Sequence, residues 1–338
     1  MCNTGDMNAQ ETAPVTTEVV ERTGIITLDR PKALNSLNGE MVALIAGALD
    51  AWRDDDAIDR VVLRSSGKHF CAGGDVRAAR EGVLSGRAAD VDRFFEEEYA
   101  LNLAIDRYPK PWISLVSGVD MGGGLGISAH GSHMVVTEDA FASMPEMNIG
   151  FVTDVGMSWR LQHLPGHPSR ALGTFLALTG YRMSADDMLA TGLATHKVAS
   201  LDGLAERIAG EGPDVLDELA LEQGPSELER WYPQIEEVFT GSWAEITARF
   251  ADHPELRELV DELTAQASPS SLVASAELMR ANAAHDLEGA LRNERALGAL
   301  LSREPDFAEG VRAVLVDKSR DPRFAAQPEP GKYRAVLR

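Results

Sequence analysis

The sequence is poor in cysteine, has few basic residues relative to acidic ones and contains no long hydrophobic run. Its two cysteines, Cys2 and Cys71, cannot build a disulfide framework, so we expect a reducing, cytoplasmic location. With 53 acidic against 32 basic residues the formal net charge is -21, which opposes binding to nucleic acid or to an anionic membrane through overall electrostatics. No apolar run approaches the roughly 20 residues that cross a bilayer. A hydrophobic content of 44% still allows a substantial buried core, so we expect a globular protein.

The sequence divides into three parts. Residues 1–17 are polar and lack both the apolar core of a signal peptide and the arginine-rich face of a transit peptide, which predicts a flexible N-terminus. Residues 18–200 alternate strand-like and helix-like segments, which predicts an α/β core. Residues 201–338 show amphipathic helical patterns with almost no strand signal, which predicts a helical C-terminal region. Strands are predicted at residues 19–20, 25–28, 61–63, 112–116, 134–136 and 198.

Several helix starts are visible in the sequence. The helix predicted over residues 39–53 follows Asn38, whose side chain can accept a hydrogen bond from the first turn. Ser184 with Asp187 three residues later resembles a capping box, with Asp in place of the usual Glu. A second long helix is predicted over residues 91–107.

Two glycine-rich turns are the most informative features. Gly122–Gly124 expose unshielded backbone N–H groups at the start of a helical stretch, where an anion would be stabilised. Residues 70–75 form a second turn of this kind, between the predicted strand at 61–63 and a helical stretch at 75–81. Ligands collect at the carboxyl ends of strands in open α/β sheets, so the two turns together predict a two-amide oxyanion hole. An isolated glycine triplet would instead indicate a tight turn with close helix packing.

Two carboxylates follow the glycine triplet. Glu146 comes directly after Pro145, and Asp154 lies eight positions further on. Neighbouring carboxyl groups push their pKa values apart, so one can act as base or nucleophile while the other donates or orients. The alternatives are an acidic first-turn residue for Glu146 and a helix N-cap for Asp154. The acidic clusters at 54–56 and 96–98 are interpreted as solvated helix faces without a function.

In order and spacing these segments resemble the crotonase (enoyl-CoA hydratase/isomerase) superfamily. The matching segments are 24–31 with Asn35, 70–75, 122–124 and 145–146. Within the superfamily the chain is most similar to the 3-hydroxyisobutyryl-CoA hydrolases, through segments 71–75, 144–146, 154–156, 194–196, 268–272 and 309–318. The resemblance implies an α/β fold, a crotonase-like spiral of ββα units with an extended helical C-terminal region.

The resemblance also implies a function, the hydrolysis of an acyl-CoA thioester, most closely 3-hydroxyisobutyryl-CoA in valine breakdown. It implies Glu146 and Asp154 as catalytic residues, without deciding whether Glu146 attacks the carbonyl or activates water. It implies oxyanion donors at Ala72, or its neighbour Gly73, and at Gly123. Coenzyme A would enter as part of the substrate, and no prosthetic group is expected. The histidines lack metal-ligand spacing, so no metal is expected. The implied substrate and coenzyme A contacts are Lys32, Leu34, Ala72, Gly73, Gly74, Asp75, Gly122 and Gly123.

Gly126 separates this chain from the hydratases that it resembles. Those enzymes carry a second glutamate at this position, and adding water across a double bond needs paired acid and base groups. An enoyl-CoA hydratase or isomerase is therefore the alternative function. A non-catalytic CoA-binding or RNA-binding module is less favoured, because the chain is acidic and both carboxylates are present.

Several properties are left open by the sequence. Thr153 and Met157-Ser158 depart from the hydrolase pattern beside the acyl group, so the acyl preference is not fixed. The segment from Glu309 to Asp317 is either a lid over the site or a packing helix. The oligomeric state is not fixed, and a homo-oligomer is compatible with the resemblance.

Overall fold

The computed structural model describes residues 13–325 and 327–338. Most of the predicted flexible N-terminus, residues 1–12, and with it Cys2, lies outside the described residues. The first strand, β1 (Val15–Val20), begins three residues before the predicted start of the core. It pairs antiparallel with β2 (Thr23–Leu28), Val15 lying opposite Leu28. The prediction of a flexible segment up to residue 17 is therefore wrong for residues 15–17, because hydrogen bonding to β2 fixes them.

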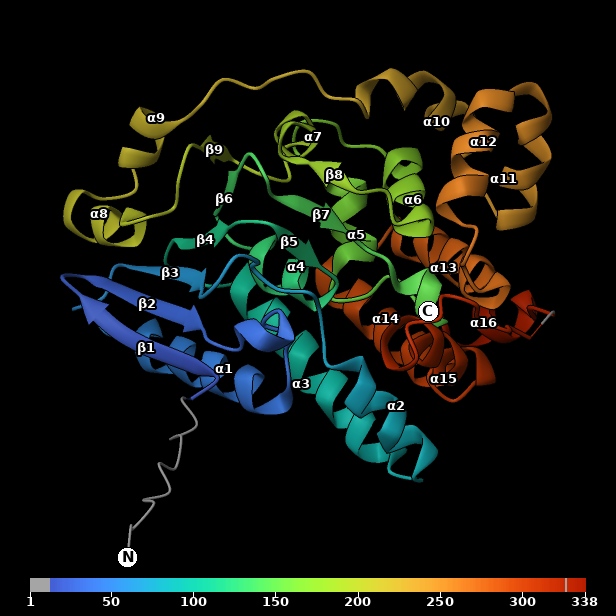
Figure 1. The fold of residues 1–338 in the computed structure, drawn as a ribbon, viewed down its shortest axis with the longest axis horizontal. Coiled ribbons are helices and arrows are strands. Elements are labelled where there is room, and N and C mark those ends of the chain that lie inside the picture. Colours follow the sequence, from blue (N-terminus) through green and yellow to red (C-terminus); the bar gives the residue numbers. More distant parts are fainter. Residues whose placement is uncertain (1–12, 326) are drawn as a thin grey trace, which may run out of the picture.

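A six-stranded sheet forms the centre of the α/β core (Figure 1). Its order is β1-β2-β3-β4-β6-β9, and every pair except the first is parallel. All six predicted strands are confirmed. The four strands not yet given are β3 (Arg60–Ser65), β4 (Trp112–Val116), β6 (His133–Thr137) and β9 (His196–Val198).

Helices cover both faces of this sheet. One face packs against α1 (Gly39–Arg53) and α3 (Ala88–Asp106), and the other against α8 (Leu204–Glu211) and α9 (Val215–Leu219). Alternate residues of the strands supply the two faces, as the pleat of a β-strand requires. The predicted caps are also present: the Asn38 side chain accepts from Met41 N at 2.9 Å, and a capping box starts α7 (Ala185–Thr191).

A small second sheet positions the glycine turns. It consists of β5 (Val119–Met121), β7 (Phe141–Ser143) and β8 (Met183–Ser184), strands too short to leave a periodic signal in the sequence. β5 and β7 run parallel with Met121 opposite Ser143, and Cys71 forms a parallel bridge to Asp120. Three chain segments therefore end side by side, just before the first glycine turn, the glycine triplet and the Glu146 turn.

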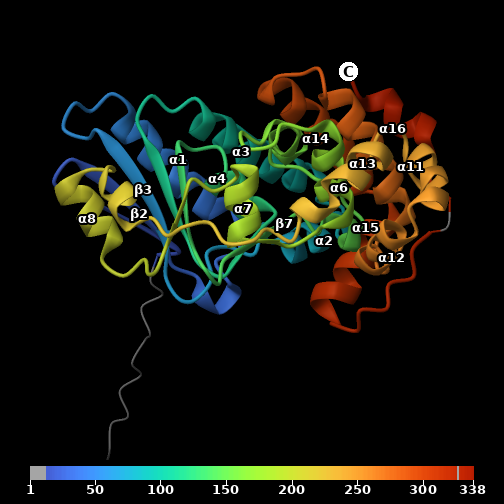
Figure 2. The same cartoon turned by 90° about the horizontal axis from the view of Figure 1, so that it is seen from above.

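No strand lies beyond β9 in the part of the chain that the structure describes, in agreement with the predicted helical region. This region is not one separate body, since α8 and α9 return to the large sheet while the later helices pack beside α3 and α6 (Figure 2). The remaining α-helices are α2 (Val76–Leu84), α4 (Gly123–Ser128), α5 (Met157–Arg160), α6 (Arg170–Thr179), α10 (Tyr232–Val238), α11 (Trp243–Arg249), α12 (Pro254–Leu263), α13 (Pro269–Asn282), α14 (Leu287–Leu301), α15 (Pro305–Val311) and α16 (Pro330–Val336). Short 3-10 helices span Pro31–Ala33, Glu146–Ile149, Leu161–His163, Glu229–Trp231 and Phe250–Asp252, and a π-helix spans Arg312–Val316.

Helix α15 packs on the turn that carries Glu146. The approach is so close that a Cβ on Gly150 would stand 2.4 Å from the backbone of Asp306, and one on Gly310 would stand 2.5 Å from the backbone of Ile149. Two glycines thus let α15 lie directly on the site, and whether it also moves as a lid stays a prediction. No helix among the described residues is long and apolar enough to cross a membrane.

Candidate active site

The two glycine turns meet at the ends of their strands. Gly123 N lies 3.6 Å from the position that a Cβ of Gly73 would take, and a Cβ on Gly123 would stand 3.1 Å from Gly74 N. Gly123 is the first residue of α4, so its N–H has no partner within the helix. Gly74 N–H also lacks an acceptor among the described residues. In the parallel bridge between Leu37 and Gly74, Leu37 N donates to Gly73 O and Asp75 N donates to Leu37 O, so the bridge does not use Gly74 N–H. Two amides without an acceptor among the described residues therefore lie close together.

Ala72 is not one of the free amides. Its N–H donates to Leu34 O at 3.0 Å. An amide used in this way cannot also stabilise an oxyanion, so the expected donor role of Ala72 is wrong. Gly74, expected only to contact the substrate, is better placed than Gly73, because its nitrogen lies beside Gly123.

The Glu146 carboxylate lies directly against the glycine triplet. Glu146 is the first residue of its 3-10 helix and is buried, and Oε1 would be 2.7 Å from a Cβ on Gly122. Gly122 also has a φ of 50°, where only glycine is free of strain. Any side chain at Gly122 would therefore displace the carboxylate that the site needs.

A third carboxylate, Glu98 of α3, completes the cluster. It is 1% exposed, and its Oε1 would stand 2.5 Å from a Cβ on Gly123. This oxygen has no hydrogen-bond partner among the described residues. The interpretation of residues 96–98 as a solvated face is right for Glu96 and Glu97 and wrong for Glu98.

Asp154 is buried and accepts a hydrogen bond from Tyr99 OH, at 2.6 Å to Oδ2. It precedes a strained turn: Val155 has a φ of 52°, which costs a β-branched residue about 1–3 kcal/mol, and Gly156 has a φ of 79°. His130 Nε2 lies 2.8 Å from Val155 O, and burial lowers the pKa of His130 to about 4, so a neutral ring donates this bond. The turn is therefore held in place by other parts of the molecule rather than by local preference.

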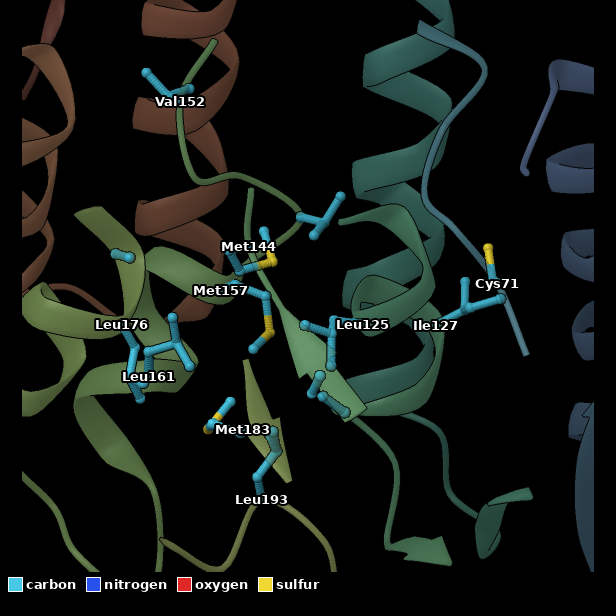
Figure 3. Packing of buried hydrophobic residues seen from close by; sticks show 14 of the residues in the cluster. Cys71, Leu125, Ile127, Met144, Val152, Met157, Leu161, Leu176, Met183 and Leu193 are labelled. Atoms are coloured by element: carbon cyan, nitrogen blue, oxygen red, sulfur yellow. The ribbon is translucent and has the colours of Figure 1, made fainter. Parts of the chain in front are cut away.

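A buried apolar cluster supports both carboxylate turns (Figure 3). Met144, two residues before Glu146, and Met157, three residues after Asp154, belong to it together with Leu125 of α4. All three side chains are at most 2% exposed. Close packing of this kind fixes the backbone from which the Glu146 and Asp154 side chains project.

The surroundings of the three carboxyl groups oppose their ionisation. Burial raises the pKa of Glu98 and of Glu146 well above the ordinary range, and the charge of Asp154 raises both further. Burial also raises the pKa of Asp154 to about 7, against the hydrogen bond from Tyr99. None of the three forms an ion pair with a basic side chain among the described residues. Burial and mutual repulsion therefore favour the protonated forms of these groups, as general acid–base chemistry needs.

We expect the free protein to lose stability between about pH 4 and pH 7. Unfolded carboxyl groups titrate near pH 4, whereas folded Asp154 titrates near 7, so the folded state binds more protons in this range. The extra proton on folded Asp154 stabilises the protein fully below the unfolded pKa. This stabilisation is lost as the pH rises through the folded pKa, which lowers the free energy of unfolding by a few kcal/mol. Thermal midpoints measured against pH should fall in the wild type and less steeply in Asp154→Asn. Equal slopes in the two proteins would show that Asp154 keeps an ordinary pKa.

Gly126, where the resemblance implies a glutamate in the hydratases, has no space for a side chain. A Cβ there would stand 2.7 Å from Asn102 Nδ2 and 2.8 Å from the Cβ of Val155. Asn102 is fully buried, and neither of its side-chain polar atoms has a partner among the described residues. Asn102 and Val155 thus fill the space that the second glutamate would need.

The expected coenzyme A contacts differ in exposure. Lys32 and Leu34 are exposed on the 3-10 turn that pairs with Ala72. Asp75 caps α2 through Ala78 N at 3.4 Å and lines a pocket of about 300 Å³ between α2 and α3. No group of three potential metal ligands occurs within residues 13–325 and 327–338, and the expectation of no metal stays a prediction.

Comparisons with known proteins show the family of the chain. The family model for enoyl-CoA hydratase/isomerase matches residues 23–329. The 3-hydroxyisobutyryl-CoA hydrolase, mitochondrial, of Xenopus tropicalis is 37% identical over 322 residues, which cover 89% of this chain and 81% of the relative. The human protein of the same name is 35% identical over 319 residues, with the same two shares.

Two solved structures share the whole fold. A carnitinyl-CoA dehydratase from Mycobacterium thermoresistibile has a TM-score of 0.89 at 35% identity and covers 97% of both chains. An enoyl-CoA hydratase from Rhodobacter sphaeroides 2.4.1 has a TM-score of 0.85 at 34% identity, covering 96% of this chain and 97% of its own. The predicted fold class and the resemblance to 3-hydroxyisobutyryl-CoA hydrolases are confirmed, and the chain belongs to the enoyl-CoA hydratase/isomerase (crotonase) family.

Proposed function

We propose that the protein hydrolyses an acyl-CoA thioester, with 3-hydroxyisobutyryl-CoA as the substrate and 3-hydroxyisobutyrate and CoA as the products. The observation that carries this proposal is the buried Glu146 carboxylate beside the free amides of Gly74 and Gly123. The curated relatives at 35–37% identity support the substrate, since they are named for it. This reaction would place the protein in valine breakdown.

The thioester oxygen would lie at the two amides, which stabilise the negative charge that develops on it. The carbonyl carbon would then face Glu146. If Glu146 attacks, the C–S bond breaks, CoA leaves as the thiolate, and water hydrolyses the resulting mixed anhydride. If Glu146 instead takes a proton from water, the hydroxide attacks the carbonyl directly and the same C–S bond breaks. Both routes yield the acid and CoA, and both need an ionised Glu146.

The other two carboxyl groups suit the polar acyl chain. Glu98 Oε1 lacks a partner beside Gly123, so a substrate hydroxyl that reached it would satisfy a buried oxygen. Asp154 has Oδ2 bonded to Tyr99, which leaves Oδ1 for the substrate or for orienting Glu146. A simple acyl chain without a hydroxyl would leave these groups unpaired. The site therefore favours 3-hydroxyacyl thioesters.

An enoyl-CoA hydratase or isomerase is the second candidate. Glu98 and Glu146 both lie against the glycine triplet, so two carboxylates are present although Gly126 replaces the expected one. The two solved structures are also named as a dehydratase and a hydratase. We favour the hydrolase because the curated relatives bear that name and because the usual position of the second glutamate is filled.

Release of free CoA separates the two candidates. Purified protein incubated with 3-hydroxyisobutyryl-CoA should liberate a thiol, which a thiol-reactive dye detects as it forms. The matched reaction with crotonyl-CoA, followed by loss of the enoyl absorbance, should be much slower. Rapid hydration of crotonyl-CoA without thiol release would contradict the hydrolase and support the hydratase.

The proposal needs only carboxyl groups and backbone amides, so we propose no prosthetic group, and coenzyme A takes part as a portion of the substrate. The carboxylates argue against a purely CoA-binding or RNA-binding module. The curated relatives carry the word mitochondrial in their names, so the cytoplasmic location expected from composition stays a prediction, as does a homo-oligomer.

A further inference from the structure

A fourth buried carboxylate lies behind the Asp154 turn. Glu294 of α14 is 0% exposed, although no charged partner balances it among the described residues. Its Oε2 accepts from Gly156 N at 2.7 Å, and its Oε1 accepts from Ser158 N at 3.2 Å and from the Ser158 hydroxyl. Glu294 thus caps the start of α5 from a helix more than 130 residues away along the chain.

The cap belongs to a continuous buried network. Asn282 Nδ2 donates to Ser158 Oγ at 2.6 Å, and Asn293 Nδ2 donates to Asn282 Oδ1 at 2.8 Å. Asn293 in turn pairs with the backbone of Arg338 at 2.9 and 3.1 Å. Satisfied networks of this kind are rigid, and this one connects α13, α14 and the segment after α16 to the Asp154 turn.

The turn needs such support because its conformation is unfavourable. Val155 lies in the left-handed region, and a Cβ on Gly156 would stand 2.8 Å from His130 and 2.6 Å from Leu287. Glu294 holds the turn at Gly156 N and His130 holds it at Val155 O, one on each side of the same peptide group. The direction of the Asp154 side chain follows from this backbone.

We propose that Glu294 is a positioning residue, which fixes the Val155–Gly156 turn and thereby keeps Asp154 on Tyr99 and beside Glu146. The proposal rests on the proposed function, since it assigns Asp154 a part in that reaction. Ser158, which departs from the hydrolase pattern of the sequence, then has a role: it supplies two of the three hydrogen bonds that Glu294 accepts.

The test compares Glu294→Gln with Glu277→Gln. Glu277 is also buried in the helical region, at 4% exposure, but it pairs with Arg280 and Arg334 and does not contact the turn. Glutamine at 294 keeps the size of the side chain and loses one acceptor. We expect kcat for thiol release to fall about 10- to 100-fold with KM within about threefold, because a small displacement of a reacting group is costly. Glu277→Gln should leave both values unchanged.

The pH profile distinguishes positioning from general loss of structure. Tyr99, Glu98, Glu146, His130 and Glu294 are the titratable groups around Asp154, and buried Arg160 lies near His130. Burial raises the pKa of Asp154 to about 7, so release of the turn should move the Asp154 limb of the kcat profile to lower pH. A smaller folded fraction would lower the profile without moving it.

Hydrogen exchange supplies a readout besides activity. Amides 154–160 should exchange faster in Glu294→Gln than in the wild type or in Glu277→Gln. If Glu294→Gln does not fold, Ser158→Ala takes its place, because it removes one bond to Glu294 and keeps the carboxylate. The inference would be overturned if the variant that folds had the kcat of the wild type, the same position of the Asp154 limb and the same exchange rates at amides 154–160. A wild-type protein that releases no CoA would instead overturn the proposed function, and the exchange result would still decide the role of Glu294.

Discussion

Replacing Glu146 by glutamine is expected to lower kcat for CoA release by a factor on the order of 10³ or more, because it removes the group that attacks the carbonyl or activates water. Binding should change little. Glutamine has the size of glutamate, and the free amides of Gly74 and Gly123 that would bind the thioester oxygen are untouched. The measurement pairs thiol release under saturating substrate with the dissociation constant of a non-hydrolysable acyl-CoA thioether.

The stability of the same variant provides its control. Burial raises the pKa of Glu146, so at pH 8 this carboxyl destabilises the folded wild type relative to the unfolded chain. Glu146→Gln should therefore unfold at a higher temperature than the wild type at pH 8. If Glu146→Gln is more stable and still binds the thioether but does not release CoA, the substitution has impaired the catalytic step and not the fold. If Glu146→Gln kept most of its kcat, Glu146 would be only an acidic residue at a helix start.

The glycine turns were predictable because their signal is local. Consecutive glycines after a strand pattern expose backbone amides regardless of the place of the strand in the sheet. Parallel strands then bring their carboxyl ends, and these amides with them, to one edge of the sheet. The choice between Ala72 and Gly74 was not predictable in this way. It depends on the hydrogen bond from Ala72 N to Leu34 O and on the bridge between Gly74 and Leu37, which join segments more than 30 residues apart.

Glu98 and Glu294 were not predicted from the sequence, and the reason is the same for both. Each lies on the apolar stripe of a long helix, so its burial depends on which face the helix turns inward. On α3 the stripe contains Val91, Phe95, Glu98, Tyr99, Asn102 and Ile105. On α14 it contains Leu287, Ala290, Leu291, Glu294, Leu297 and Leu301. A carboxylate at helical spacing within such a stripe was therefore a usable signal, stronger than its place in an acidic cluster.

Replacing Asp154 by asparagine should slow 3-hydroxyisobutyryl-CoA more than isobutyryl-CoA, which lacks the hydroxyl, if Asp154 recognises that hydroxyl. An imperfectly matched buried polar pair costs roughly 1–3 kcal/mol, or about 5- to 150-fold in kcat/KM. Asparagine can still accept the bond from Tyr99 OH, so the turn should keep its shape. The measurement is the ratio of kcat/KM for the two thioesters in the wild type and in Asp154→Asn.

Glu98→Gln is the matched comparison, because Glu98 is the other buried carboxylate with an oxygen free for the hydroxyl. Suppose that Glu98→Gln lowers kcat/KM mainly for the hydroxylated thioester while Asp154→Asn lowers it equally for both thioesters. That pair of results would assign recognition of the hydroxyl to Glu98. Asp154 would then serve the step common to both substrates, through the proton that its pKa of about 7 lets it hold or release. No loss on either thioester in Asp154→Asn would remove Asp154 from the reaction, and with it the reason for the strained turn that His130 and Glu294 hold in place.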